Sequence, residues 1–196
     1  MYSTLLAPLV SHIHFFFAHC RLLITSTVPV WRRLIVGALA LSTCNTTVAE
    51  PTDRELQITA AYLYHFIQFT EWPEKPTVFH YCVYQNADFA DLLRKTYSDK
   101  TVGDASIDVS NINEQKKLDD CHLIYFPQTV SPDFLQKISK YAILSVGSQK
   151  DFTQLGGIIY LFEEDQKLRF YINNSAATDT GLTISSQLLK LSRAEP

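Results

Sequence analysis

The sequence predicts an α/β domain, in which a mostly parallel central sheet is flanked by helices and followed by a C-terminal antiparallel hairpin and a long terminal helix. Between residues 56 and 146, apolar strand-like runs alternate with amphipathic helical segments, which is the order that builds a parallel sheet with right-handed crossovers. The last third departs from this alternation, because residues 163–166 alone separate two strand patterns. So short a connection predicts an antiparallel hairpin.

The elements follow in order from hydrophobic periodicity. Apolar side chains recur at helical spacing over residues 56–69, and Pro73 disfavours helical backbone just before it, so a helix is expected there. Residues 78–84 alternate between two apolar or aromatic sets, which predicts a strand buried on both faces. The same reasoning predicts helices over 88–97 and from Ser131, strands over 105–112, 121–127 and 143–146, and a helical turn over 113–120.

The stretch 167–193 organises the end of the chain. Residues 157–162 and 167–173 are the two strands of the predicted hairpin, and the period then changes from 2 to that of a helix. Ser175 or Thr178 is a candidate N-cap for a long terminal helix. Its apolar stripe is Ala177, Leu182, Ile184, Leu188, Leu189 and Leu191. We expect this helix and the helix at 56–69 to pack together on one sheet face.

Composition describes an ordinary globular protein, with 46% hydrophobic and 19% charged residues in 196 positions. Residues 1–49 contain three of the 17 basic residues and no acidic one, so residues 50–196 carry 14 basic against 20 acidic side chains. A domain with a net charge of −6 and no basic cluster is a poor match for the phosphate backbone. We therefore expect no nucleic-acid partner, and a single domain over 50–196.

Residues 1–49 have the organisation of an exported precursor. Trp31-Arg32-Arg33 and the short apolar run 34–41 are typical of a signal peptide, and cleavage after Ala49 fits the small-residue rule. The alternative of a membrane-spanning helix needs about 20 apolar residues, more than this run supplies. A lipoprotein site at Cys44 is a second alternative, and an upstream misassigned start would explain the apolar residues 1–20.

Five sequence blocks carry a family resemblance: AAYLYHFIQFTEWP at 60–73, DDCHLIYF at 119–126, LSVGSQKDFTQLGGIIYL at 144–161, LRFYINNSAA at 168–177 and SSQLLKL at 185–191. With these blocks in this order, the chain resembles the YfiR family over about residues 56–191. The resemblance implies a small periplasmic α/β protein. In the best-known members it is a repressor that docks on the periplasmic domain of an inner-membrane diguanylate cyclase. The resemblance brings no catalytic motif, and we expect no cofactor.

Cysteine use points to a disulfide. Removal of residues 1–49 would leave only Cys82 and Cys121, and an even pair in an exported domain indicates a bridge. The first and third strands of a doubly wound sheet are neighbours, so the two sulfurs could meet, although two buried free thiols remain the alternative. The YfiR resemblance supports the bridge, because members carry cysteine in the matching blocks. A second pair that some relatives have near residues 151–157 is absent from this chain.

Two glycine-containing segments are candidates for ligand binding. Gly147 and Ser148 follow a predicted parallel strand at its carboxyl end, where open α/β sheets bind ligands, so they are assigned to a small-molecule pocket. Gly156-Gly157 precedes a strand and does not open a helix, which favours a tight turn over a phosphate loop.

Histidine and cysteine also suggest a zinc alternative. His80 shares a predicted strand face with Cys82, and His122 adjoins Cys121. Zinc accepts such ligands, but the spacing matches no tight metal-binding pair and a disulfide would consume both thiols. No metal is therefore predicted. No nucleophile has a base and an orienting acid at a recognisable spacing, so no catalytic residue is assigned.

Function is therefore expected to come from binding. The first and terminal helices carry more apolar residues than one sheet face can cover, and an exposed apolar patch marks a partner surface. The candidate partner-binding residues are Tyr62, Phe66, Phe69 and Leu188, with the neighbouring Asn173 and Asn174.

Three functions from different classes are compared. The first is a non-enzymatic periplasmic regulator of a membrane diguanylate cyclase, with biofilm formation as its cellular output. The alternative is a periplasmic small-ligand-binding module that serves a sensor kinase or an outer-membrane receptor. A thiol oxidoreductase would need a C-x-x-C motif, which the sequence lacks. A homodimer and a small-molecule ligand stay open as further partners.

Overall fold

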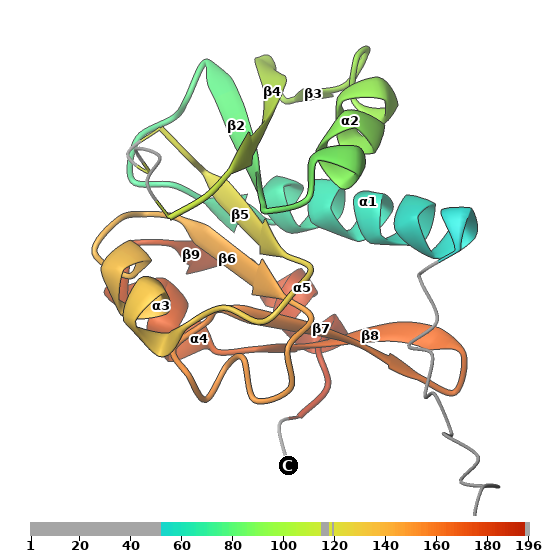
Figure 1. Ribbon diagram of the computed structural model, residues 1–196. Helices are drawn as coiled ribbons and strands as arrows, with labels where there is room; N and C mark the ends of the chain where they lie inside the picture. The colour runs from blue at the N-terminus through green and yellow to red at the C-terminus, as the bar shows by residue number, and fades with distance from the viewer. Residues whose placement is uncertain (1–51, 115–117, 119, 195–196) are drawn as a thin grey trace, which may run out of the picture. The chain divides into compact units, whose positions relative to one another are not determined.

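The computed structural model describes residues 52–114, 118 and 120–194, all within the compact unit Ala49–Pro196 (Figure 1). The signal peptide expected over 1–49 lies outside the described residues, as do residues 115–117 and 119 of the expected turn. The helices are α1 (Asp53–Gln68), α2 (Ala87–Thr96), α3 (Pro132–Ile138), α4 (Asn174–Asp179) and α5 (Ser186–Leu191). The strands are β1 (Thr70–Glu71), β2 (Val78–Tyr84), β3 (Thr101–Val102), β4 (Ala105–Ile112), β5 (Leu123–Phe126), β6 (Leu144–Gly147), β7 (Ile159–Glu164), β8 (Lys167–Ile172) and β9 (Thr183–Ile184).

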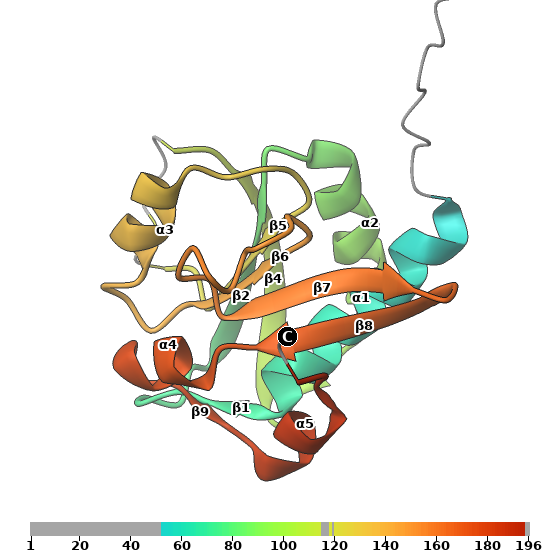
Figure 2. The same ribbon diagram turned by 90° about the horizontal axis from the view of Figure 1, so that it is seen from below.

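A seven-stranded sheet in the order β3-β4-β2-β5-β6-β7-β8 forms the centre of the fold (Figures 1 and 2). Strands β4, β2, β5, β6 and β7 run parallel, whereas β3 and β8 at the two edges are antiparallel to their neighbours. Separately, β1 and β9 pair with each other. The predicted class, a mostly parallel sheet with a C-terminal hairpin, is confirmed.

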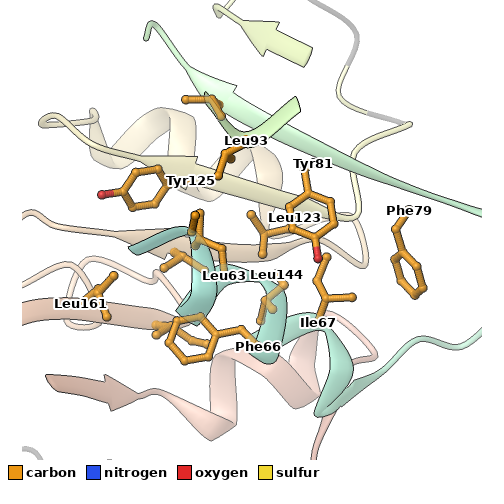
Figure 3. Close-up of a cluster of buried hydrophobic side chains, with 14 of the residues drawn as sticks. Leu63, Phe66, Ile67, Phe79, Tyr81, Leu93, Leu123, Tyr125, Leu144 and Leu161 are labelled. Carbon is orange, nitrogen blue, oxygen red and sulfur yellow. The ribbon is translucent and has the colours of Figure 1, made fainter. Parts of the chain in front are cut away.

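Burial on both faces explains why the strand patterns are so apolar. On one face, Tyr81 and Val83 of β2 belong to the core that includes α1 and α2, part of which is shown in Figure 3. On the other face, Cys82 and Tyr84 belong to a second core that includes α3. Because successive side chains of a strand point to opposite faces, a strand covered on both sides needs apolar residues at nearly every position.

The helix and turn signals are satisfied locally. The side chain of Ser131 accepts a hydrogen bond from the backbone of Phe134, with Pro132 at the first position of α3, as predicted. In the β7–β8 hairpin, Asp165 and Gln166 both have positive φ angles, of 50° and 58°. Two successive left-handed residues make a type I′ connection, whose twist matches that of the flanking strands.

The prediction of one continuous helix over 177–191 is wrong. A terminal helix is present as α5, but α4 and β9 precede it. Gly181 has φ +85°, its N–H bonds to the carbonyl of Thr178, and the N–H of Leu182 bonds to the carbonyl of Ala177. This is the Schellman pattern, which ends α4. The side chain of Ser185 then caps α5.

Candidate partner-binding groove

A groove with a volume of about 540 Å³ is lined by residues of α1, β8 and α5. Figure 2 shows these three elements near the C-terminal end of the described chain. We call it the α1–β8–α5 groove. It is lined by Ala61, Tyr62, His65, Phe66, Phe69, Leu168, Arg169, Phe170, Leu188 and Leu191. Most of these side chains are apolar, so the groove presents a surface that water solvates poorly.

Helix α1 supplies one wall because its register is fixed at both ends. Thr52 and Glu55 form a reciprocal capping box at the start of the helix. At the other end, the N–H of Ser185 bonds to the carbonyl of Phe69 at 2.9 Å, and β1 pairs with β9. The two ends of the domain are thereby joined, and the predicted packing of the first helix with the terminal segment is confirmed.

Aromatic contacts build the floor of the groove. The rings of Phe66 and Phe170 meet edge to face at 5.1 Å, and Tyr62 contacts both rings at 5.8 and 6.0 Å. The Tyr62 hydroxyl donates to the carbonyl of Leu168 at 3.1 Å. Edge-to-face pairs contribute about 0.5–1.5 kcal/mol beyond burial, so this aromatic floor is preformed and does not have to assemble on binding.

The structure separates the predicted partner-binding residues by exposure. Phe66 and Leu188 are 1% and 3% exposed and form the floor, so they are not outward-facing. Tyr62 and Phe69 are half-buried on the wall. Leu191 is 71% exposed and stands at the groove. It was assigned to a buried stripe from the sequence, and no local signal distinguishes its position from that of Leu188.

The two predicted asparagines have different surroundings. Asn173 caps α4, because its Oδ1 accepts from the N–H of Ala176 at 2.9 Å, and its Nδ2 donates to the carbonyl of Thr153 at 3.0 Å. Asn174 is exposed at the first position of α4. Asn173 therefore has a structural task whether or not it contacts a partner.

The C-terminal residues cross the free edge of β8. The N–H of Arg193 bonds to the carbonyl of Phe170 at 2.9 Å, and its guanidinium contacts the carboxylate of Glu164 at 2.7 Å. Unpaired edge strands invite pairing with other chains, and this segment occupies part of that edge.

The disulfide lies on the other face of the sheet. Cys82 of β2 and Cys121, just before β5, are bridged with a Cα–Cα distance of 6.0 Å, and both residues are buried. Strands β2 and β5 are neighbours, so the predicted Cys82–Cys121 bridge is confirmed.

Since both thiols are used, the zinc alternative loses its sulfur ligands, and among the described residues no cluster of three metal-ligating side chains is present.

The model of the YfiR/HmsC-like family matches residues 56–193, which span α1, the whole sheet, the groove and the disulfide. The chain belongs to the YfiR/HmsC-like family. No curated protein matches it in sequence. The family is one of regulatory, periplasmic proteins and not of known catalysts. Among the described helices of this YfiR/HmsC-like chain, none is long and apolar enough to cross a bilayer.

In this YfiR/HmsC-like domain, the segment after β6 is tightly packed. Phe152 is fully buried between Gly147 and Gly157, and a Cβ at either glycine would collide with its ring. The hydroxyl groups of Ser148 and Tyr125 are 3.0 Å apart. The Gly156-Gly157 pair forms a turn before β7, with Gly156 at φ +97°. The ligand pocket assigned to Gly147 and Ser148 stays a prediction.

Proposed function

We propose that this chain is a non-enzymatic periplasmic regulator that binds the periplasmic domain of an inner-membrane diguanylate cyclase and represses cyclic di-GMP synthesis. Membership of the YfiR/HmsC-like family supports the regulatory role. The structural observation that carries the binding role is the α1–β8–α5 groove, an apolar surface with a preformed aromatic floor and an exposed leucine. Exposed apolar grooves mark contact sites for proteins, membranes or ligands, and membership of a regulatory family favours a protein partner here.

The residues of the groove have two different roles in the proposed binding. Phe66 and Leu188 are already covered by the fold, so they set the shape of the floor. Tyr62, Phe69 and Leu191 keep apolar surface in contact with water and would lose it to a partner. Fully burying a leucine side chain stabilises by about 1.5–3 kcal/mol. A partner with one apolar face, such as an amphipathic helix, meets these requirements.

Charge substitution at Leu191 tests this proposal with a matched control. Leu191→Asp places a carboxylate at the groove, whereas Ile58→Asp places one on α1 at another exposed apolar residue, 38% exposed, that does not line the groove. Capture of the cyclase from solubilised membranes by the mature protein should weaken by roughly tenfold or more for Leu191→Asp. Ile58→Asp should retain binding. Equal binding by both variants would remove the groove from the interface.

Cells give the second test. Deleting the gene should raise cyclic di-GMP and biofilm formation, and the Leu191→Asp variant should fail to restore repression. An unchanged cyclic di-GMP level together with a lost response to a small solute would replace the regulator with the ligand-binding module. Light scattering of both purified variants measures whether a second copy of the chain occupies the groove instead.

A further inference from the structure

A second, smaller cavity of about 240 Å³ lies on the opposite face of the β7–β8 hairpin from the α1–β8–α5 groove. Side chains alternate between the two faces along a strand. Leu161 and Phe170 therefore face the core that includes α1 and α2, whereas Tyr160, Phe162 and Tyr171 face away from that core. These three rings form one wall, and the loop that follows β6 forms the other. We call this site the aromatic cavity.

The three aromatic rings are stacked on one another and do not surround the cavity. Phe162 lies 4.6 Å from Tyr171 and 5.2 Å from Tyr160 between ring centroids, and the Tyr160–Tyr171 distance is 6.0 Å. Their planes differ by only 23° to 33°, so at these distances Phe162 is stacked on both tyrosines and the three rings form a stack. A quaternary ammonium group is held by rings that surround it, and on this rim the cationic Lys150 offsets the anionic Asp151, so the site does not favour a cation. An outer ring face of such a stack instead fits a ligand with one flat, weakly polar face.

The facing loop supplies hydrogen-bonding groups of both kinds. Lys150 can only donate, the Asp151 carboxylate can only accept, and the Gln154 amide can do both. All three side chains belong to exposed residues, so a ligand in the cavity can reach them. Hydroxyl groups, which both donate and accept, match such a mixed rim better than a single charged group does.

The loop is held in shape before any ligand arrives. Phe152 is fully buried, and the N–H of Leu155 bonds to the carbonyl of Asp151 at 3.0 Å. The carbonyl of Thr153 accepts from the Asn173 side chain, and the side chain of Gln149 accepts from the N–H of Val130. A rigid loop loses little conformational entropy on binding, so even a small ligand can be bound with measurable affinity.

From this geometry we infer that the aromatic cavity binds a single sugar ring. The C–H face of a pyranose packs on an outer ring face of the Tyr160–Phe162–Tyr171 stack, and its hydroxyl groups bond to the loop. At about 240 Å³ the cavity is smaller than the ~300–1,000 Å³ of sites for drug-sized ligands, and this suits one ring better than a nucleotide or a lipid. The inference is independent of the cyclase partner and of the α1–β8–α5 groove.

NMR titration of the ¹⁵N-labelled mature protein, with its disulfide intact, tests the inference. The probes are D-glucose, D-galactose and N-acetyl-D-glucosamine, with benzamide as a flat ligand that lacks hydroxyl groups. At least one sugar should perturb the amide signals of residues 148–157 and of β7 and β8, while benzamide leaves them in place. No perturbation by any of the sugars, or perturbation by benzamide alone, would overturn the proposal.

Variants then locate the site. Phe162→Ala should weaken binding of the responding sugar by roughly tenfold, the equivalent of one aromatic contact. Gln154→Ala changes an exposed loop residue that can be removed without disturbing the core, and it should also weaken binding. Tyr141→Ala removes an aromatic side chain that is 38% exposed and lies outside the cavity, and it should bind as the unchanged protein does. Full binding by Gln154→Ala and Phe162→Ala would place the sugar elsewhere and refute the assignment.

Discussion

Removing the disulfide should cost this domain a large part of its stability. The bridge joins Cys82 to Cys121 across a sequence separation of 39 residues. In the chain-entropy model, a loop of this length contributes about 4 kcal/mol by restricting the unfolded chain. Domains are typically stable by about 5–15 kcal/mol, so loss of the bridge would bring a modestly stable domain close to unfolding.

Urea unfolding of the Cys82→Ala/Cys121→Ala double variant measures this cost. With a slope near 2 kcal/mol per molar urea, the midpoint should fall by about 2 M. The slope should also rise, because the unbridged unfolded chain exposes more surface. The double variant also leaves space where two buried sulfurs lay. Chemical reduction of the unchanged protein is the matched control, since it opens the bridge and keeps both sulfurs.

Agreement between the reduced protein and the double variant, within about 1 kcal/mol, would assign the loss to the bridge and not to the cavity. A loss below about 1 kcal/mol by both routes would refute the reasoning, because the loop-closure entropy would then be absent from the unfolded state. Loss of repression in cells should follow the loss of folded protein.

Three further predictions concern packing and pH. Gly181→Ala should lower the free energy of unfolding by about 1 kcal/mol or more, since Gly181 has φ +85° and an added Cβ would lie 3.2 Å from the Pro73 ring; thermal denaturation measures it. Phe66→Ala should cost about 3–5 kcal/mol in urea unfolding, because this side chain is 1% exposed. Burial, with a smaller contribution from His80, lowers the pKa of His122 below its ordinary value of about 6.5. The unfolded chain therefore binds a proton at His122 more readily than the folded chain does. The stability that neutral His122 contributes is fully present above pH ~6.5 and should be lost as the pH falls through the lowered pKa. His122→Asn should reduce this pH dependence of the free energy of unfolding, measured by urea titration.

Strand β2 of the central sheet could be predicted because both of its faces are covered, and β4 because its buried and exposed residues roughly alternate. Residues 105–112 were predicted as a strand and form β4 with the same bounds, and residues 78–84 likewise form β2. Burial on two sides forces an apolar or aromatic residue at nearly every position of β2, so the signal is local and strong. The disulfide was predicted from the even cysteine pair of an exported domain and the expected neighbourhood of the first and third strands, with support from the YfiR resemblance.

The terminal segment was mispredicted because helical and extended residues there share one apolar stripe. Leu182 and Ile184 fit a helical period with Ala177, yet they lie beyond the end of α4. Gly181 and Ser185 are the two local signals that divide the segment, one as a left-handed helix stop and the other as a new cap. Apolar periodicity records only which positions are apolar, so it does not detect where a helix ends.

The division of the groove into floor and wall could not be predicted for a different reason. Phe66 is buried because Phe170 of β8 packs against it, and that contact joins residues more than 100 positions apart. Leu188 and Leu191 occur in the same short helix, yet one is buried and the other is exposed. Only the placement of α5 against α1 decides between them, and this placement depends on the β1–β9 pairing.

The edge of β8 limits how a partner can use the groove. Two of its backbone carbonyls are already engaged, that of Leu168 by the Tyr62 hydroxyl and that of Phe170 by the N–H of Arg193. A partner strand added to this edge would have to displace both contacts, whereas a helix laid in the groove would displace neither. Binding should therefore depend on apolar burial at Leu191 and its neighbours, and should change little between low and high salt. Strong weakening by salt would instead indicate that the charged residues at the edge, Arg193 and Glu164, carry the contact.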